Sequence, residues 1–152
     1  MDNVTNISAA RLHIVTGPLT APEVHADAYD PLPVGGVDAF GCDFTADSGS
    51  AVIASTMWTA SLDPGSTDAS DPDPQSRILG SWAAEKVDVR STIDGTISTI
   101  SGQFSIAMIG NFPQSAVGGT YRLVASASLT DTRVLVAVTD VLCVAASIKS
   151  DA

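Results

Sequence analysis

The feature of this 152-residue chain that most constrains its fold is a strict two-residue alternation near its C-terminal end. Successive side chains of a strand point to opposite faces, so an apolar residue at every second position predicts a strand with one buried face. Residues 121–129 show this spacing, followed by the polar turn Thr130-Asp131-Thr132 and a second strand with the same rhythm. The sequence therefore predicts a long antiparallel hairpin. Its alternating apolar positions are Tyr121, Leu123, Ala125, Ala127 and Leu129, then Val134, Val136 and Val138.

Shorter stretches upstream give the same signal. Phe40, Cys42 and Phe44 alternate with small or polar residues, as do Phe104, Ile106 and Met108, and residues 52–62 form a further predicted strand that contains Trp58. Asp94-Gly95 lies between isoleucines and is a typical hairpin-turn pair. Residues 77–89 remain ambiguous, because Trp82 and its neighbours fit a helical turn while Val87 and Val89 alternate like a strand.

Composition also favours strands joined by turns. The acidic residues are nearly all Asp, with Glu23 and Glu85 as the two glutamates, and the usual residues of helix surfaces are scarce. We therefore predict an all-β protein, a β-sandwich of about seven antiparallel strands over residues 37–148.

Residues 1–36 differ from this body. Pro18, Pro22, Pro31 and Pro33 interrupt them, so we predict an extended N-terminal arm that is either mobile or ordered against a neighbouring subunit. Within the arm, residues 11–15 form a short predicted strand that could pair with a partner's sheet edge. The predicted interface residues of the arm are Arg11, Leu12, His13, Ile14 and Val15.

Charge and targeting signals narrow the function classes. The net charge is −10, and the few basic residues form no cluster, so nucleic acid is not an expected partner. The first residues carry an acid and no apolar stretch, and no segment has the roughly 18 apolar residues that span a bilayer. We expect synthesis in a cytoplasm and no membrane partner.

No catalytic, cofactor-binding or metal-binding residues are predicted. His13 and His25 share no motif with a serine or a cysteine, and we expect both to be partly exposed on the arm. Residues 63–74 are rich in Asp and Pro and predict a solvated loop. They lack the sixth-position Gly and the closing Glu of an EF-hand, so calcium is not an expected ligand. Cys42 and Cys143 fit either two buried reduced thiols or a disulfide between opposite sheets.

The two tryptophans receive different predictions. Trp58 lies in a predicted strand of a chain with only 5% aromatic residues, so we expect it in the core. Trp82 lies between Gly80-Ser81 and Glu85-Lys86, and either a core position or a surface contact suits this polar setting. We add Trp82 to the predicted interface residues.

Several segments, in order, resemble the phage fiber-tail adaptor proteins of tailed bacteriophages. They comprise Phe40 to Phe44, Ser55-Thr56-Met57-Trp58-Thr59, Gly118-Gly119-Thr120-Tyr121-Arg122-Leu123, and Thr132-Arg133 before the last apolar strand. The resemblance covers about residues 37–145, while residues 63–74 and 77–89 have no counterpart, and Asp131-Thr132 stands where the family has Gly before its Arg. It implies an immunoglobulin-like sandwich, a place in the virion, symmetric copies, contacts with tail, neck or fiber subunits, and no catalysis.

Two other functions remain open on the sequence. A capsid decoration protein would share the fold but differ in copy number. A carbohydrate- or surface-binding sandwich would use Trp82 and nearby loops.

Overall fold

The structure is a computed structural model that describes residues 5–15, 23–24 and 29–146, and these residues form an all-β protein. The strands are β1 (Thr5–Ser8), β2 (Leu12–Ile14), β3 (Glu23–Val24), β4 (Tyr29–Pro33), β5 (Val37–Asp43), β6 (Ile53–Asp63), β7 (Ile78–Arg90), β8 (Ile97–Gly110), β9 (Thr120–Leu129) and β10 (Val134–Val144). Short helices connect some of them: η1 (Ala9–Arg11), α1 (Thr45–Ser48), η2 (Pro74–Arg77) and η3 (Gln114–Ala116). The predicted all-β class is confirmed.

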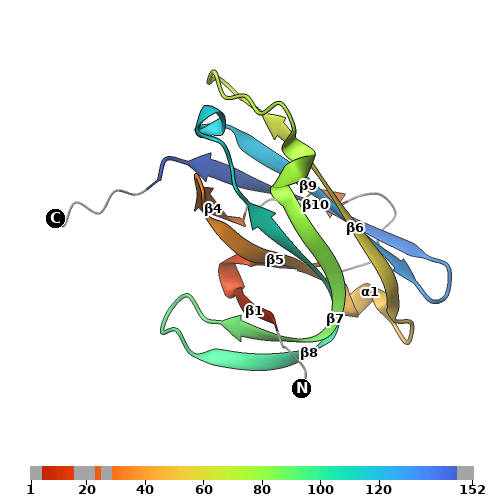
Figure 1. The fold of residues 1–152 in the computed structure, drawn as a ribbon. Coiled ribbons are helices and arrows are strands. Elements are labelled where there is room, and N and C mark those ends of the chain that lie inside the picture. The colour runs from red at the N-terminus through yellow and green to blue at the C-terminus, as the bar shows by residue number, and fades with distance from the viewer. Residues whose placement is uncertain (1–4, 16–22, 25–28, 147–152) are drawn as a thin grey trace.

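The strands form two five-stranded sheets that lie in two layers (Figure 1). Sheet A has the order β1-β7-β8-β5-β2, and sheet B has the order β3-β10-β9-β6, with β4 also paired to β10. The long strands pair antiparallel, but β1, β2, β3 and β4 pair in parallel with the strands they border. The prediction of antiparallel strands alone is therefore not confirmed, since the short N-terminal strands make both sheets mixed.

The main hydrophobic core lies between the two sheets. Trp58 of β6 is 2% exposed, as predicted, and its Nε1 donates a 2.8 Å hydrogen bond to Ser105 Oγ of β8, which links the layers. The predicted inward face of β9 is confirmed, because all five of its alternating apolar residues are buried. The larger members of this core include Tyr29, Phe40, Phe44, Trp58, Ile109, Phe112, Tyr121, Leu123 and Leu129.

A second, smaller core covers the outer face of sheet A. It consists of Ile7, Ala39, Val87, Phe104 and Ile106, with β1 lying over the sheet. A Cβ at Gly41 would lie 2.8 Å from Ile106 Cδ1 and 3.1 Å from Ile7 Cδ1, so glycine permits this close approach. Residues 104–107 are consequently buried on both faces of the strand, whereas the alternation in the sequence predicts one buried face.

The face predicted for β10 is wrong. Its inward side chains are Leu135, Ala137, Val141 and Cys143, while Val134 is exposed. The register explains the difference, because the turn after β9 places Val134 opposite Ser128 and Leu135 opposite Ala127. Directly opposed residues share a face, so the odd-numbered positions of both strands point into the core. The hairpin itself is confirmed.

The N-terminal segment borders both sheets of its own chain. β1 pairs with β7 and β2 with β5 in sheet A, whereas β3 and β4 lie along β10 in sheet B. Ile7, Val15, Tyr29 and Leu32 are buried, and the Tyr29 hydroxyl donates a 2.8 Å hydrogen bond to the Gly41 carbonyl oxygen. In the described residues, the segment predicted to be an arm is thus extended, and it completes the chain's own sheets.

The ambiguous residues 77–89 belong almost entirely to β7, and Asp94-Gly95 forms the turn between β7 and β8 as predicted. Register shifts occur between Ile78 and Gly80 and between Ala84 and Lys86. Beyond the second shift, the far halves of β7 and β8 curve away and form one end of the molecule (Figure 1). No helix among the described residues is long and apolar enough to cross a membrane.

Candidate interaction surfaces

The described residues hold no group of three or more His, Cys, Asp or Glu side chains placed to bind a metal ion. Their most unusual surface feature is instead a set of exposed large hydrophobic side chains. Single exposed apolar residues are common, but neighbouring ones mark contact surfaces. The set is Ile14, Val37, Val52, Met57, Leu79, Trp82, Ile93, Ile97, Val134 and Leu142.

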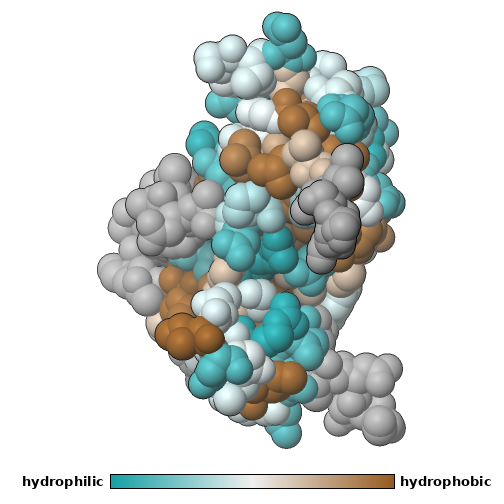
Figure 2. Space-filling view, turned by 90° about the vertical axis from the view of Figure 1, so that its left-hand side faces the viewer, coloured by the Kyte–Doolittle hydropathy of each residue, from teal (hydrophilic) through white to brown (hydrophobic). Residues whose placement is uncertain are grey.

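A mostly apolar groove of about 390 Å³ lies between the η1–β2 segment and the far end of the β7–β8 hairpin. We call it the hairpin groove. Hydrophobic patches surrounded by polar side chains are visible at this end of the molecule (Figure 2). The apolar lining consists of Ala9, Leu12, Ile14, Val89, Ile93 and Ile100, and serine and threonine side chains complete it.

The turn at the tip of the hairpin holds Ile93 in the solvent. The Ser91 amide donates to the Thr96 carbonyl oxygen at 2.8 Å, and Asp94 Oδ1 accepts from both the amide and the hydroxyl of Thr96. These bonds fix the turn, and the Ile93 side chain is 94% exposed. The sequence analysis missed Ile93 as a surface residue, although a large apolar side chain beside a hairpin-turn pair is itself a signal of exposure.

The predicted interface residues of the N-terminal segment separate into two groups. Leu12 and Ile14 line the hairpin groove, and Ile14 is 58% exposed. His13 and Val15 are buried, so the expectation that His13 is partly exposed is wrong, while His25 lies outside the described residues.

Arg11 belongs with His13 and Val15 rather than with the groove residues, because its side chain is held by contacts within the fold. Its guanidinium donates to Asp38 Oδ2 of β5 and to the Pro31 carbonyl oxygen of β4, both at 2.6 Å, and lies 5.2 Å from the centre of the Phe40 ring. Because β4 and β5 belong to different sheets, Arg11 bridges the two layers on this side of the molecule. Its side chain is already used within the fold.

Trp82 lies on the outer face of sheet A, away from the hairpin groove. It is paired with Ile106 of the second core and is 36% exposed. A Cβ at neighbouring Gly80 would meet nothing within 4 Å. The structure therefore does not bring Trp82 together with the other predicted interface residues, but it does leave the indole accessible.

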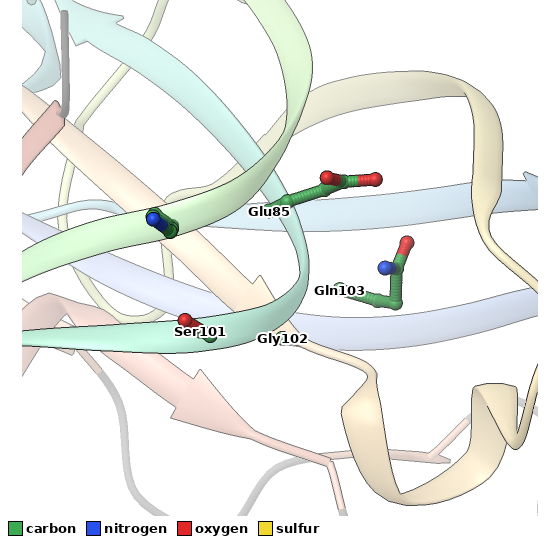
Figure 3. A pocket seen from close by; sticks show the side chains of 5 residues that line it. Glu85, Ser101, Gly102 and Gln103 are labelled. Atoms are coloured by element: carbon green, nitrogen blue, oxygen red, sulfur yellow. The ribbon is translucent and has the colours of Figure 1, made fainter. Parts of the chain in front are cut away.

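A polar pocket of about 450 Å³ lies where β7 and β8 bend, lined by Glu85, Lys86, Ser101, Gly102 and Gln103. The side chains of Glu85 and Gln103 extend into the same space (Figure 3). Gln103 is already committed to the fold, because its Oε1 accepts a 2.8 Å hydrogen bond from the Ile53 amide at the start of β6. The pocket thus offers one exposed carboxylate and one exposed amine, which is a solvated hollow rather than an acid–base pair.

The acidic loop before η2 is only partly solvated as predicted. The Asp71 side chain is fully buried; it accepts from Arg77 Nε at 2.9 Å and Nη2 at 3.2 Å, and from the Tyr121 hydroxyl at 2.5 Å. Burial alone would raise the pKa of Asp71, but the hydrogen bonds from Tyr121, the Asp73 amide and Arg77 hold it below its usual value. Asp71 therefore joins this loop to sheet B.

Neither Cys42 nor Cys143 forms a disulfide bond, and both are buried in the main core, which matches the interpretation as reduced thiols. Burial raises the pKa of the Cys143 thiol, and the Asp71 carboxylate raises it further. Tyr29 lies beside Cys42, and burial likewise raises the pKa of its phenol. These are the properties of structural rather than reactive groups.

Comparison of the chain with protein-family models, with curated proteins and with solved structures found no match.

Proposed function

We propose that the chain is a virion structural protein of a tailed bacteriophage, acting as a tail, neck or fiber adaptor. It binds neighbouring virion subunits in a symmetric assembly, and its body is an immunoglobulin-like sandwich. The phage assignment rests on the ordered motifs of the sequence, whereas the mode of action rests on the surface of the structure.

The proposed mode of action rests on the hairpin groove together with Ile93, which lies at the tip of the β7–β8 hairpin. Burying a fully exposed isoleucine is worth about 1.5–3 kcal/mol, which an isolated subunit leaves unused. The turn bonds around Asp94 hold this side chain outward without help from other apolar contacts. A fixed apolar projection beside an apolar groove is suited to contact with another protein subunit.

The described part of the fold also suits a structural role. The two cores bury both faces of β8 at residues 104–107, and the short N-terminal strands cover edges of both sheets. Such a body can carry load at a junction between subunits without a conformational change.

The test uses phage particles assembled from a genome that lacks the gene for this chain, with the chain supplied from a plasmid. Ile93→Asp should leave the melting temperature unchanged, because the side chain makes almost no contacts, yet it should remove the chain from purified particles. Ser66→Asp is the control, since it adds the same charge at an exposed loop position outside the hairpin groove and should be incorporated. Incorporation of Ile93→Asp at the wild-type copy number would refute the proposed mode of action.

A further inference from the structure

The far half of β8 has an edge to which no described strand is paired. β5 pairs with β8 only as far as Asp43 and then leaves the sheet at α1, whereas β8 continues to Ile97. We call residues 97–101 the β8 edge. The Thr96 carbonyl oxygen accepts from the Ser91 amide, so the backbone groups of Thr96 point toward β7. Successive residues of a strand direct these groups to opposite sides, so three residues direct theirs away from β7, namely Ile97, Thr99 and Ser101.

The two faces of the β8 edge differ in chemistry. On one face, Ser98 and Ile100 line the hairpin groove. On the other, which we call the polar face, Thr99 Oγ1 donates a 2.5 Å hydrogen bond to Asp88 Oδ1, and Ser101 lines the polar pocket where the strands bend (Figure 3). Main-chain hydrogen bonds with separate pockets for alternate side chains are the means by which sheet edges bind an added strand.

Other described edges lack this combination. Gln75 of η2 covers the β6 edge, because its Oε1 accepts from the Ala60 amide at 3.0 Å and its Nε2 donates to the Trp58 carbonyl oxygen at 2.9 Å. Proteins commonly block exposed edges in this manner. Residues 79–84 of β7 also have no described partner besides β8, but the hairpin groove does not extend to them. The β8 edge is therefore the edge with a groove beside it.

One segment outside the described residues suits both faces. Residues 1–4 and 25–28 are shorter than the β8 edge, and residues 16–22 contain two prolines, which cannot donate backbone hydrogen bonds. Residues 147–152, Ser-Ile-Lys-Ser-Asp-Ala, contain no proline and have one large apolar side chain between two polar ones. In a strand these residues place the isoleucine on one face and its two neighbours on the other.

Charge also favours this segment. On the polar face, Asp88 and Arg90 of β7 lie on successive rows of the hairpin. Lys149 and Asp151 carry the opposite charges at the same two-residue spacing. Antiparallel pairing that places Lys149 on the row of Asp88 therefore places Asp151 on the row of Arg90. Opposite charges then lie on the same rows, which offsets the repulsion between two copies of net charge −10.

The apolar face selects the same direction. With Lys149 opposite Thr99, antiparallel pairing places Ile148 opposite Ile100, in the hairpin groove. Parallel pairing on the same row would place Ser150 opposite Ile100 instead. The antiparallel register thus matches apolar with apolar and charge with opposite charge.

Within a single chain, this segment cannot reach the β8 edge. Residues 34–37 connect the end of β10 to Gly110 at the opposite end of β8, through a hydrogen bond to the Val144 carbonyl oxygen and through strand pairing. The nine residues from Gly110 to Ser101 extend about 30 Å along the strand, at about 3.4 Å per residue. The three residues from Val144 to Ser147 reach at most about 11 Å. The segment must therefore come from a second copy.

We propose that residues 147–151 of a second copy add to sheet A as a strand antiparallel to the β8 edge, with Ile148 in the hairpin groove. This inference rests on the proposed function, because it names another copy of the chain as the subunit that occupies the groove. The contact joins two different surfaces, so it repeats from copy to copy and forms a ring where the rotation closes.

Sedimentation velocity of the full chain over a series of concentrations tests the contact. The wild type should self-associate, and Ile148→Asp should weaken the association at least about tenfold, because it places a charge in an apolar groove. Ser66→Asp is the control, since it adds the same charge at an exposed loop position and should associate like the wild type. A wild type that is monomeric at every concentration, or Ile148→Asp chains that associate like the wild type, would overturn the inference.

The same variants separate this inference from the proposed function. Normal self-association of Ile148→Asp, with Ile93→Asp absent from particles, would overturn the contact between copies and leave the proposed function standing. Weakened self-association of Ile148→Asp, with Ile93→Asp incorporated normally, would support the contact and refute the proposed mode of action.

Cysteine crosslinking tests the register. Ser98→Cys chains are mixed with Ser150→Cys chains and oxidised, and the native cysteines do not interfere because both are fully buried. The antiparallel register places these two positions directly opposite each other, so the mixed disulfide should form. Ser81→Cys on β7 replaces Ser98→Cys in the control and should give little of it. Equal yields from the two mixtures, or no mixed disulfide in the first, would contradict the pairing.

Discussion

Replacing Asp71 by Asn tests whether the network that joins the acidic loop to sheet B stabilises the fold. Asn keeps the size of the side chain but removes the charge that faces Arg77. The Arg77 side chain is only 17% exposed and the Asp71 side chain is fully buried, so the guanidinium would lose its partner in a largely dry site. Breaking a buried ion pair by removing one partner costs about 3–5 kcal/mol.

We expect the lower end of that range, about 3 kcal/mol, because Arg77 keeps its 2.6 Å hydrogen bond from Nη1 to the Asn111 carbonyl oxygen. For a domain of this size, each kcal/mol shifts the melting temperature by about 2–4 °C, so Asp71→Asn should melt about 6–12 °C lower. Asp68→Asn is the control, since it removes the same charge from an exposed position in the same loop. It should change the melting temperature little.

Acid provides a second readout of the same prediction. The pKa of Asp71 is lower in the folded than in the unfolded chain, so its contribution is present above the unfolded value of about 4 and is lost as pH falls through the folded value. The difference in stability between wild type and Asp71→Asn should therefore shrink in acid. A difference below about 1 kcal/mol at neutral pH, or one that stays constant into strong acid, would refute the assigned role.

Three other substitutions test separate parts of the fold by urea denaturation. Gln75→Leu should lower the free energy of unfolding by about 1 kcal/mol and increase light scattering, because it uncovers the β6 edge; unchanged scattering would show that the edge needs no cover. Trp58→Phe should lower the free energy of unfolding by about 1–2 kcal/mol, because the hydrogen bond to Ser105 is lost. The fluorescence that remains comes from Trp82 and should be that of an exposed indole. A blue-shifted spectrum would contradict the exposed position of Trp82. Gly102→Ala should lower the free energy of unfolding by about 1–3 kcal/mol, since the added Cβ meets Thr45 Oγ1. Gly80→Ala is the control, because its added Cβ has open space and should leave the stability unchanged. Equal effects of the two substitutions would contradict the close contact at Gly102.

The local sequence pattern was sufficient to predict a strand and its inward side chains where the strand has a single buried face. The alternation in residues 121–129 predicted β9 and its inward side chains correctly, and Asp94-Gly95 predicted the turn of the β7–β8 hairpin. In β10, however, the register depends on the turn at Arg133, and a shift of one residue exchanges the faces. Local alternation also does not reveal that Ile7 of β1 packs in one cluster with Phe104 and Ile106 on the outer face of sheet A.

Contacts between residues distant in the chain account for the remaining differences. The Asp71 carboxylate is buried because it meets Tyr121, 50 positions away, and a loop rich in Asp gives no sign of that partner. The Arg11 side chain bridges two sheets through groups 20 and 27 positions along the chain. The hairpin groove likewise joins Ile14 to Ile93, so only the tip residue had a local signal of exposure.

Cryo-electron microscopy of the intact particle tests the central claim most directly, because it shows both whether this chain is present and which of its surfaces are covered. Our account predicts a two-layered β body at a tail, neck or fiber junction, with the end that carries Ile93 buried against another subunit. Particles that lack the chain, or that hold it with the hairpin groove facing solvent, would contradict the account.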